Sequence, residues 1–372
     1  MGGNIKFFSE TRRYDRKEYF KLEIEVVSKL AGNIFTQFLD YNNPMRKEIL
    51  EPIEAYHSKD TFGDMDIILR SNWLKTDWIP KIVEVFELAH GDWSKNGNVF
   101  SFAYNNFQID LIVTPSEHFQ TSLDYFKWND AGNLQGRIAH KLGTKYGHRG
   151  LELIIKNNDQ VLGEILLTTD TQKIHELLDL DHNVWKMGFY TLKDMYNWIS
   201  CSKYFNKDIY LLDNRNHYSR TRDIKRKTYS DFLLWCQDRE FENNYPHADI
   251  TEKAGYNIRE PFYSELIVPM FPHVVEEYDA IMDKFESNNL FRGKFNGKIV
   301  NEVTGLSGKE LGHFMSYAKE QIELTNTKDM FINSITYVCI RMIESLYTHY
   351  TNGWESWLSV PEEVATNFVR GE

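Results

Sequence analysis

The sequence predicts an α+β fold, in which a mixed sheet with helices is followed by a mainly helical C-terminal domain. Three observations support this. Apolar residues recur at helical spacing through residues 14–40. Between about 63 and 180, short segments typical of strands alternate with helical segments. Beyond about 200, the pattern is helical and poor in strands.

We expect three regions: an N-terminal helical segment at 1–48, a region of mixed sheet and helix at 49–205, and a helical domain at 206–372. The polar stretch DNRNHYSRTRD marks the last boundary. Expected elements, in chain order, are a strand at 64–69, a helix at 78–89, strands at 99–104 and 107–113, helices at 117–127 and 133–145, strands at 151–155 and 163–167, and helices at 171–180 and 329–349.

Composition limits the classes of function. The net charge of −11 argues against a protein that binds nucleic acid through positive charge over its whole surface. A local basic groove is still compatible with that charge, and the run SRTRDIKRKTY is the candidate. Its cations are expected to contact nucleic acid, or else to be a solvated helix start or loop; they are Arg220, Arg222, Lys225, Arg226 and Lys227.

The cysteines and the hydropathy pattern indicate the compartment. Cys201, Cys236 and Cys339 are scattered and odd in number, which favours reduced thiols. No apolar run approaches the ~18 residues that a membrane span needs. We therefore expect a cytoplasmic protein without a membrane partner.

The segment TFGDMDIIL is the most informative stretch. Side chains alternate faces along a strand, so Asp64 and Asp66 point the same way while Met65 and Ile67 face the core. Neighbouring carboxylates repel each other, and a divalent cation would stabilise the pair. Gly63 has no side chain, so backbone at that position is able to approach a phosphate closely.

Asp110 is the one charge in the apolar strand FQIDLIV. If this strand lies beside the first, the three carboxylates converge on a site for two Mg²⁺ or Mn²⁺ ions about 3.5–4 Å apart. Asp64 and Asp66 would then bridge both ions. Asp110 would bind the ion at an attacking 3′-hydroxyl and help to remove its proton.

These two segments resemble the metal motifs of the DNA polymerase β superfamily, and most closely those of the X-family DNA polymerases. The stretch SLDYFKWNDAGNLQGR is similar to the nucleotide-binding segment of that family, and the resemblance covers about residues 50–182. It implies a palm fold that transfers a nucleoside monophosphate from a (d)NTP to a DNA or RNA 3′ end. The nucleotide-binding residues that it implies are Tyr125, Phe126, Asp130, Asn133 and Arg137.

The chemistry of these residues fits that role. Asn133 and Arg137 share one helix face, because they lie four positions apart. A structural interpretation is also open, with Tyr125 and Phe126 as core aromatics, Asn133 as an N-cap and Arg137 as a solvated charge.

The chain departs from the family at two places. Ile53 and Glu54 stand where the family has a Gly-Ser pair that binds triphosphate, so we expect His57, Ser58 and Lys59 to bind phosphate instead. Lys127 and Trp128 replace a second Gly-Ser pair.

The segment TGLSGKE in the C-terminal region predicts a turn between two helices. Ser307 and Glu310 are expected to form a capping box. With Gly305, Gly308 and Lys309, the start of the second helix would bind a nucleic-acid phosphate; a plain helix–turn–helix in the core is the alternative.

Two other functions stay open. An RNA- or tRNA-end transferase of the CCA or poly(A) type is mildly favoured by the C-terminal turn. A catalytically weak relative that binds nucleotide or nucleic acid is favoured by Ile53 and Glu54.

Overall fold

The computed structural model describes residues 11–34, 41–42, 44–158, 160–237, 239–248, 250 and 262–352. Contacts divide the chain into two compact units, Met1–Val275 and Glu276–Glu372. Residues 206–275 thus belong to the first unit, whereas the sequence interpretation placed a boundary between 205 and 206. In the described part of the chain, no helix is both long and apolar enough to span a bilayer.

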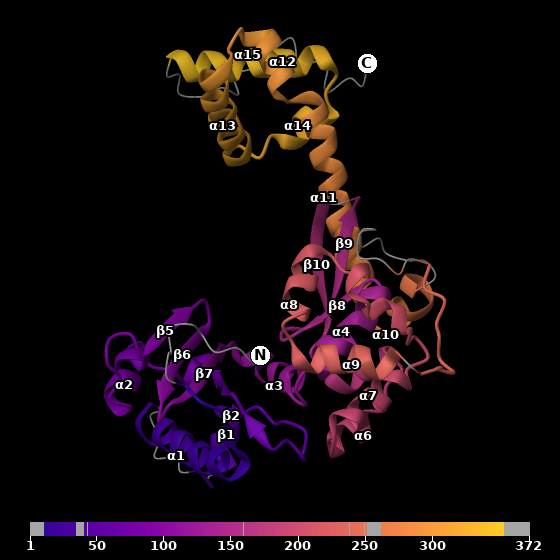
Figure 1. The fold of residues 1–372 in the computed structure, drawn as a ribbon. Coiled ribbons are helices and arrows are strands. Elements are labelled where there is room, and N and C mark those ends of the chain that lie inside the picture. Colours follow the sequence, from indigo (N-terminus) through magenta and orange to yellow (C-terminus); the bar gives the residue numbers. More distant parts are fainter. Residues whose placement is uncertain are drawn as a thin grey trace. The chain divides into compact units, whose positions relative to one another are not determined.

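A five-stranded mixed sheet is the centre of the N-terminal half of the first unit (Figure 1). Its strand order is β2-β4-β7-β6-β5, and β4 and β7 are parallel while the other pairs are antiparallel. The bounds are β2 (Leu50–Pro52), β4 (Asp64–Arg70), β5 (Trp93–Asn96), β6 (Val99–Tyr104) and β7 (Phe107–Thr114). The α+β class and the strands expected around 64–69, 99–104 and 107–113 are therefore confirmed.

Alternation along β4 explains how the sheet is covered. Met65, Ile67 and Leu69 are fully buried in a core that includes α1 (Arg16–Ile34) and Ile82 of α2 (Trp78–Val85). On the opposite face, Ile68 packs in a cluster with Ile112 and with Phe119 and Leu123 of α3 (Phe119–Phe126). Apolar side chains thus cover one face of the central strands along its whole length. On the other face they cover only the part that follows the carboxylates in each strand.

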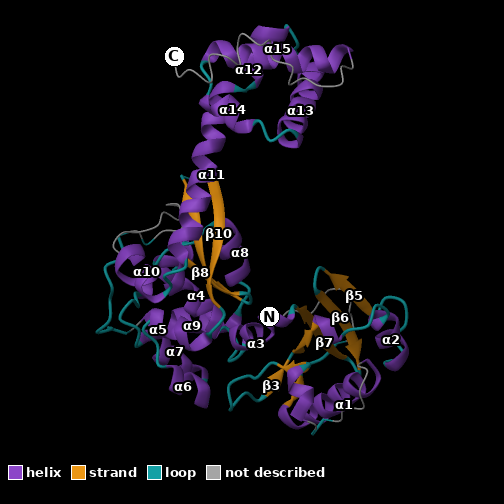
Figure 2. Ribbon diagram, turned by 180° about the vertical axis from the view of Figure 1, so that it is seen from behind, coloured by secondary structure: helices purple, strands orange, loops and turns teal. Residues whose placement is uncertain are grey.

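A second, antiparallel sheet has the order β10-β9-β8 (Figure 2). Its strands are β8 (Thr144–Gly147), β9 (Gly150–Asn157) and β10 (Gln160–Thr168), and α4 (Ala131–Lys141) packs on β8. Strand β8 begins inside the helix expected over 133–145, because Gly143 adopts a left-handed φ of 80° that ends the helix. A small pair joins β1 (Tyr14–Asp15) to β3 (Thr61–Phe62).

Helices follow the second sheet, as the sequence predicts for the region beyond 200. Those of the first unit are α5 (Thr171–Leu177), α6 (His182–Met187), α7 (Leu192–Ser200), α8 (His217–Asp223), α9 (Lys227–Gln237) and the short α10 (Val268–Met270). Helix α11 (Val274–Lys294) begins at the division between the units.

The second unit is helical and has its own core, built from residues such as Phe314, Phe331 and Ile343. Its further helices are α12 (Gly297–Thr304), α13 (Gly308–Leu324), α14 (Lys328–Asn333) and α15 (Thr336–Asn352). The single helix expected over 329–349 is wrong: Ser334 is extended, with ψ 152°, and separates α14 from α15. Its carbonyl accepts from Nζ of Lys294 at 2.9 Å, which replaces a helical hydrogen bond.

Candidate active site

Asp66 and Asp110 occupy paired positions on the parallel strands β4 and β7. Asp64 pairs in the same register with Gln108, so these four side chains emerge on one face of the sheet. Asp110 is 7% exposed, and Asp64 and Asp66 are half-buried. The expectation that the second strand lies beside the first is confirmed.

Burial and mutual repulsion act on these carboxylates. Burial, and next the charge of Asp66, raises the pKa of Asp64 to about 7. The same two causes raise the pKa of Asp110 to about 6, although hydrogen bonds from Ser101 and Gln108 favour its charged form. The site therefore concentrates acidic side chains, and a bound cation would stabilise their charged forms.

The carboxylates are chemically suited to a divalent cation, although they do not form a complete set of ligands. Among the residues that the structure describes, no three His, Cys, Asp or Glu side chains are grouped so that they could hold a metal ion. Mg²⁺ commonly takes only one or two carboxylates and completes its octahedron with water and substrate phosphate. Oδ2 of Asp64 is buried and has no hydrogen-bond partner among the residues that the structure describes, so it would be available as a ligand atom.

Two polar neighbours of Asp110 were not identified from the sequence. Nε2 of Gln108 donates to both carboxylate oxygens of Asp110, at 3.1 and 2.9 Å. Ser101 of β6 lies directly opposite Asp110 and also hydrogen-bonds to it. Strand alternation is the signal that identifies Gln108, since it precedes Asp110 by two positions and shares its face.

The loop expected to bind phosphate connects β2 to β3. The backbone amides of His57 and Ser58 donate to Phe189 and Tyr190 carbonyls, each at 2.8 Å. Burial lowers the pKa of Lys59, while the charges of Asp64 and Asp66 oppose that shift. Lys59 therefore lies within electrostatic reach of the carboxylates. Gly63 faces a cation as well, because a Cβ there would lie 2.9 Å from Nη1 of Arg13.

Trp128, at one of the departures from the family, has a strained backbone. Trp128 and Asn129 both have left-handed φ, 59° and 63°. The buried Trp128 indole packs edge-on against His57 with ring centroids 5.5 Å apart, and its amide donates to Glu54 at 2.9 Å. Nζ of Lys127 lies 3.6 Å from Oε2 of Glu54, so the two substituted positions interact with each other.

Tyr125 and Phe126 are half-buried at the end of α3. Tyr125 packs edge-on against Phe126 and Tyr146, and Phe126 stacks with His148. A Cβ at Gly132 would lie 2.2 Å from the Tyr125 carbonyl, so glycine is needed for α4 to start against α3. Tyr125 and Phe126 thus pack against other rings while part of each side chain stays exposed.

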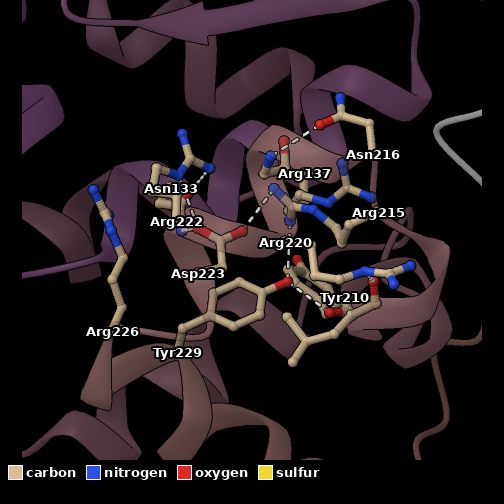
Figure 3. Close-up of polar contacts among 12 residues, drawn as sticks. Asn133, Arg137, Tyr210, Arg215, Asn216, Arg220, Arg222, Asp223, Arg226 and Tyr229 are labelled. Carbon is tan, nitrogen blue, oxygen red and sulfur yellow. Dashed lines mark hydrogen bonds and ion pairs between the residues drawn. The ribbon is translucent and has the colours of Figure 1, made fainter.

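Asn133 and Arg137 of α4 contact other parts of the protein rather than solvent (Figure 3). Asn133 accepts from Nη2 of Arg222 at 2.9 Å, and Asp130 forms an ion pair with Arg226. Arg137 is 3% exposed, and its Nε and Nη2 donate to the Ile209 carbonyl at 3.1 and 2.6 Å. In this arrangement, Arg137 holds the segment at Ile209, and a contact with a template would require that segment to move.

The cations of the basic run SRTRDIKRKTY differ in the contacts that they make. Arg222 and Arg226 are bonded to α4 and its N-terminal turn, and Arg220 donates to the Leu212 and Asp213 carbonyls. Lys225 and Lys227 are exposed. Arg222 is exposed as well, although its guanidinium is hydrogen-bonded to Asn133 and Asp223.

The turn in the second unit differs from the expected capping box. Ser307 is the N-cap of α13, but its side chain forms no capping hydrogen bond. Gly305 and Gly308 have left-handed φ of 74° and 55°, and Lys309 is exposed. The expected turn between two helices is confirmed, while the capping box is wrong because Ser307 does not direct its hydroxyl to the helix amides.

Comparison with known proteins adds no relative. No family model matches the chain, and no curated protein matches its sequence.

Proposed function

We propose that the chain is a metal-dependent nucleotidyltransferase that transfers a nucleoside monophosphate from a (d)NTP to a nucleic-acid 3′-hydroxyl. The observation that carries this proposal is the pairing of Asp66 with Asp110 on parallel strands, with Asp64 on the same face. We further propose that the five-stranded sheet is a palm of the polymerase β type.

The three carboxylates would have different roles in the reaction. Asp64 and Asp66 would hold two ions, and Asp110 would hold one. Bound Mg²⁺ or Mn²⁺ supplies charge neutralisation at the transferred phosphoryl group and makes the attacking hydroxyl more acidic. Asp110 accepts the proton of that hydroxyl, while Gln108 fixes the orientation of its carboxylate through two hydrogen bonds.

We assign the binding of substrate charge to three further cations. Lys59, within electrostatic reach of Asp64 and Asp66, is a cation for the triphosphate. Lys225 and Lys227 are exposed cations for the nucleic-acid backbone.

A nucleotide-incorporation assay tests the proposal. The full chain is incubated with Mg²⁺ or Mn²⁺, all dNTPs or all NTPs, and primer-template DNA, single-stranded DNA or tRNA. The Asp110→Asn variant should lose activity by about 10³-fold, which is the effect of several kcal/mol of lost charge stabilisation. Asp77→Asn is the matched control, because Asp77 is exposed and its side chain caps no helix amide.

The preferred acceptor then separates a DNA polymerase from an RNA-end transferase. Equal activity of the wild-type and Asp110→Asn proteins would reject the two-metal chemistry. Absence of extension on every acceptor, with nucleic acid still bound, would reject catalysis and favour the binding relative.

A further inference from the structure

A cavity of ≈ 540 Å³ lies between the start of α1, residues 41–42 and 44–47, and the loop that follows β2. Its volume falls in the ~300–1,000 Å³ range of sites for small molecules. Asp64, Asp66 and Asp110 do not line it. The cavity therefore does not include the three carboxylates, although His57 of the expected phosphate-binding loop lines it.

Aromatic rings form much of its wall. Tyr19 stacks on Phe62 with ring centroids 3.9 Å apart, and both line the cavity. Tyr41, Tyr56 and Trp128 are further rings in the lining. Flat walls of this kind fit a planar ligand, because every aromatic ring offers a face for stacking.

Buried polar groups lie between these rings. Glu23 and Arg46 line the cavity, and both are at least nine-tenths buried. Oε1 of Glu23 accepts from the Tyr41 hydroxyl at 2.9 Å, and Nη1 of Arg46 donates to Oε2 of Glu51 at 2.8 Å. Tyr19 is 4% exposed and lines the cavity, and the indole Nε1 of Trp128, which also lines it, is buried and has no hydrogen-bond partner among the residues that the structure describes. A buried donor without a partner is uncommon and points to a ligand that supplies an acceptor.

The charges of the lining balance. Among the residues that the structure describes, the lining has three cations, Arg16, Arg46 and Lys47, and three carboxylates, Glu23, Glu51 and Glu54. A triphosphate would be placed beside three carboxylates, and a polycation beside three cations. The lining therefore selects a neutral ligand that has both hydrogen-bond donors and acceptors.

We propose that this cavity binds a nucleobase, presented as a nucleoside, with Tyr19 and Glu23 hydrogen-bonding its edge and the aromatic rings stacking on its faces. Binding here needs no metal and no catalysis, so it goes beyond the transfer reaction proposed above.

Equilibrium dialysis of the full chain in EDTA against adenosine, guanosine, cytidine and uridine tests this. At least one nucleoside should saturate a single site. Tyr19→Phe keeps the stacked ring and Glu23→Gln keeps the shape, and each should weaken binding about tenfold through the loss of one hydrogen bond. Thermal unfolding of each variant verifies that it is folded.

Two controls make the result specific. Glu25→Gln is the same substitution on the same helix, and Glu25 hydrogen-bonds to Tyr104 outside the cavity, so binding should not change. Asp110→Asn should also bind as the wild type does. Failure of every nucleoside to bind would overturn the proposal, as would binding that is lost in Asp110→Asn but kept in Tyr19→Phe and Glu23→Gln, since the ligand would then lie at the carboxylates.

Discussion

Arg222 and Asn133, 89 positions apart in the sequence, are joined by a 2.9 Å hydrogen bond from Nη2 to Oδ1. The neighbouring Asp223 accepts from Nε of Arg222 at 2.9 Å and forms an ion pair with Arg215 at 2.8 Å (Figure 3). The expected nucleotide-binding helix and the expected basic segment thus form one network. Asp223 is its centre, because its carboxylate contacts two arginines.

Replacing Asp223 should be strongly destabilising. The side chains of Arg215 and Asp223 are 2% and 0% exposed, so Asp223→Ala leaves a buried guanidinium without its carboxylate. We expect the free energy of unfolding to fall by about 3–5 kcal/mol, measured by urea denaturation. Asp213→Ala is the control, because that carboxylate is 99% exposed and lies 3.9 Å from Arg220; it should leave stability unchanged. Equal stability of the two variants would contradict the central role of Asp223.

The central strands and their carboxylates were predictable because alternation along a strand is a local property. Asp64, Asp66 and Asp110 stand out as charges within apolar strands, and their convergence needed only that the strands be neighbours. The network of Asp223 was not predictable, since it depends on packing between helices remote in sequence. The break at Ser334 was also missed, because a tertiary hydrogen bond from Lys294 replaces a local one.

Gly188 is expected to tolerate no side chain. Its φ is 81°, and a Cβ would lie 2.6 Å from Cη2 of Trp128 and 2.8 Å from Nε2 of His57. Gly97→Ala is a matched control, since Gly97 has a φ of 59° with no atom within 4 Å of a Cβ. The control should lose about 1 kcal/mol through backbone strain alone, and Gly188→Ala about 1–3 kcal/mol more through overpacking. Chemical denaturation measures both, and equal losses would show that the contact with Trp128 and His57 relaxes freely.

Asp110→Asn should stabilise the metal-free protein while removing its response to metal. Asp110 lies beside Asp66 on the neighbouring strand, and loss of that like-charge contact should raise stability by about 1 kcal/mol. Mg²⁺ should raise the unfolding temperature of the wild type, because a ligand that binds only the folded state stabilises it. The variant should respond less. Thermal unfolding in EDTA and in Mg²⁺ measures both effects, and a variant less stable than the wild type in EDTA would contradict the repulsion.

His175 should make stability depend on pH. It is fully buried beside Trp185 and Trp198, its Nε2 lies 3.1 Å from Oε1 of Gln135, and its Nδ1 lies 3.0 Å from Nδ1 of His182. Burial, and next the charge of His182, lowers its pKa from 6.5 to about 3. Below pH 6.5 the unfolded chain therefore binds a proton at His175, whereas the folded chain binds it only near pH 3. The contribution of His175 to the free energy of unfolding is thus complete above pH 6.5 and is lost as the pH falls.

The loss assigned to His175 should be about 2 kcal/mol between pH 7.5 and pH 5. His175→Phe keeps an aromatic ring among the tryptophans and removes the titrating group, so the pH dependence of its unfolding free energy should be flatter by that amount. His217→Gln, at an exposed position, is the control and should follow the wild type. Urea denaturation at each pH gives the three curves. Parallel curves for the wild type and His175→Phe would show that the buried imidazole does not govern the acid sensitivity of the fold.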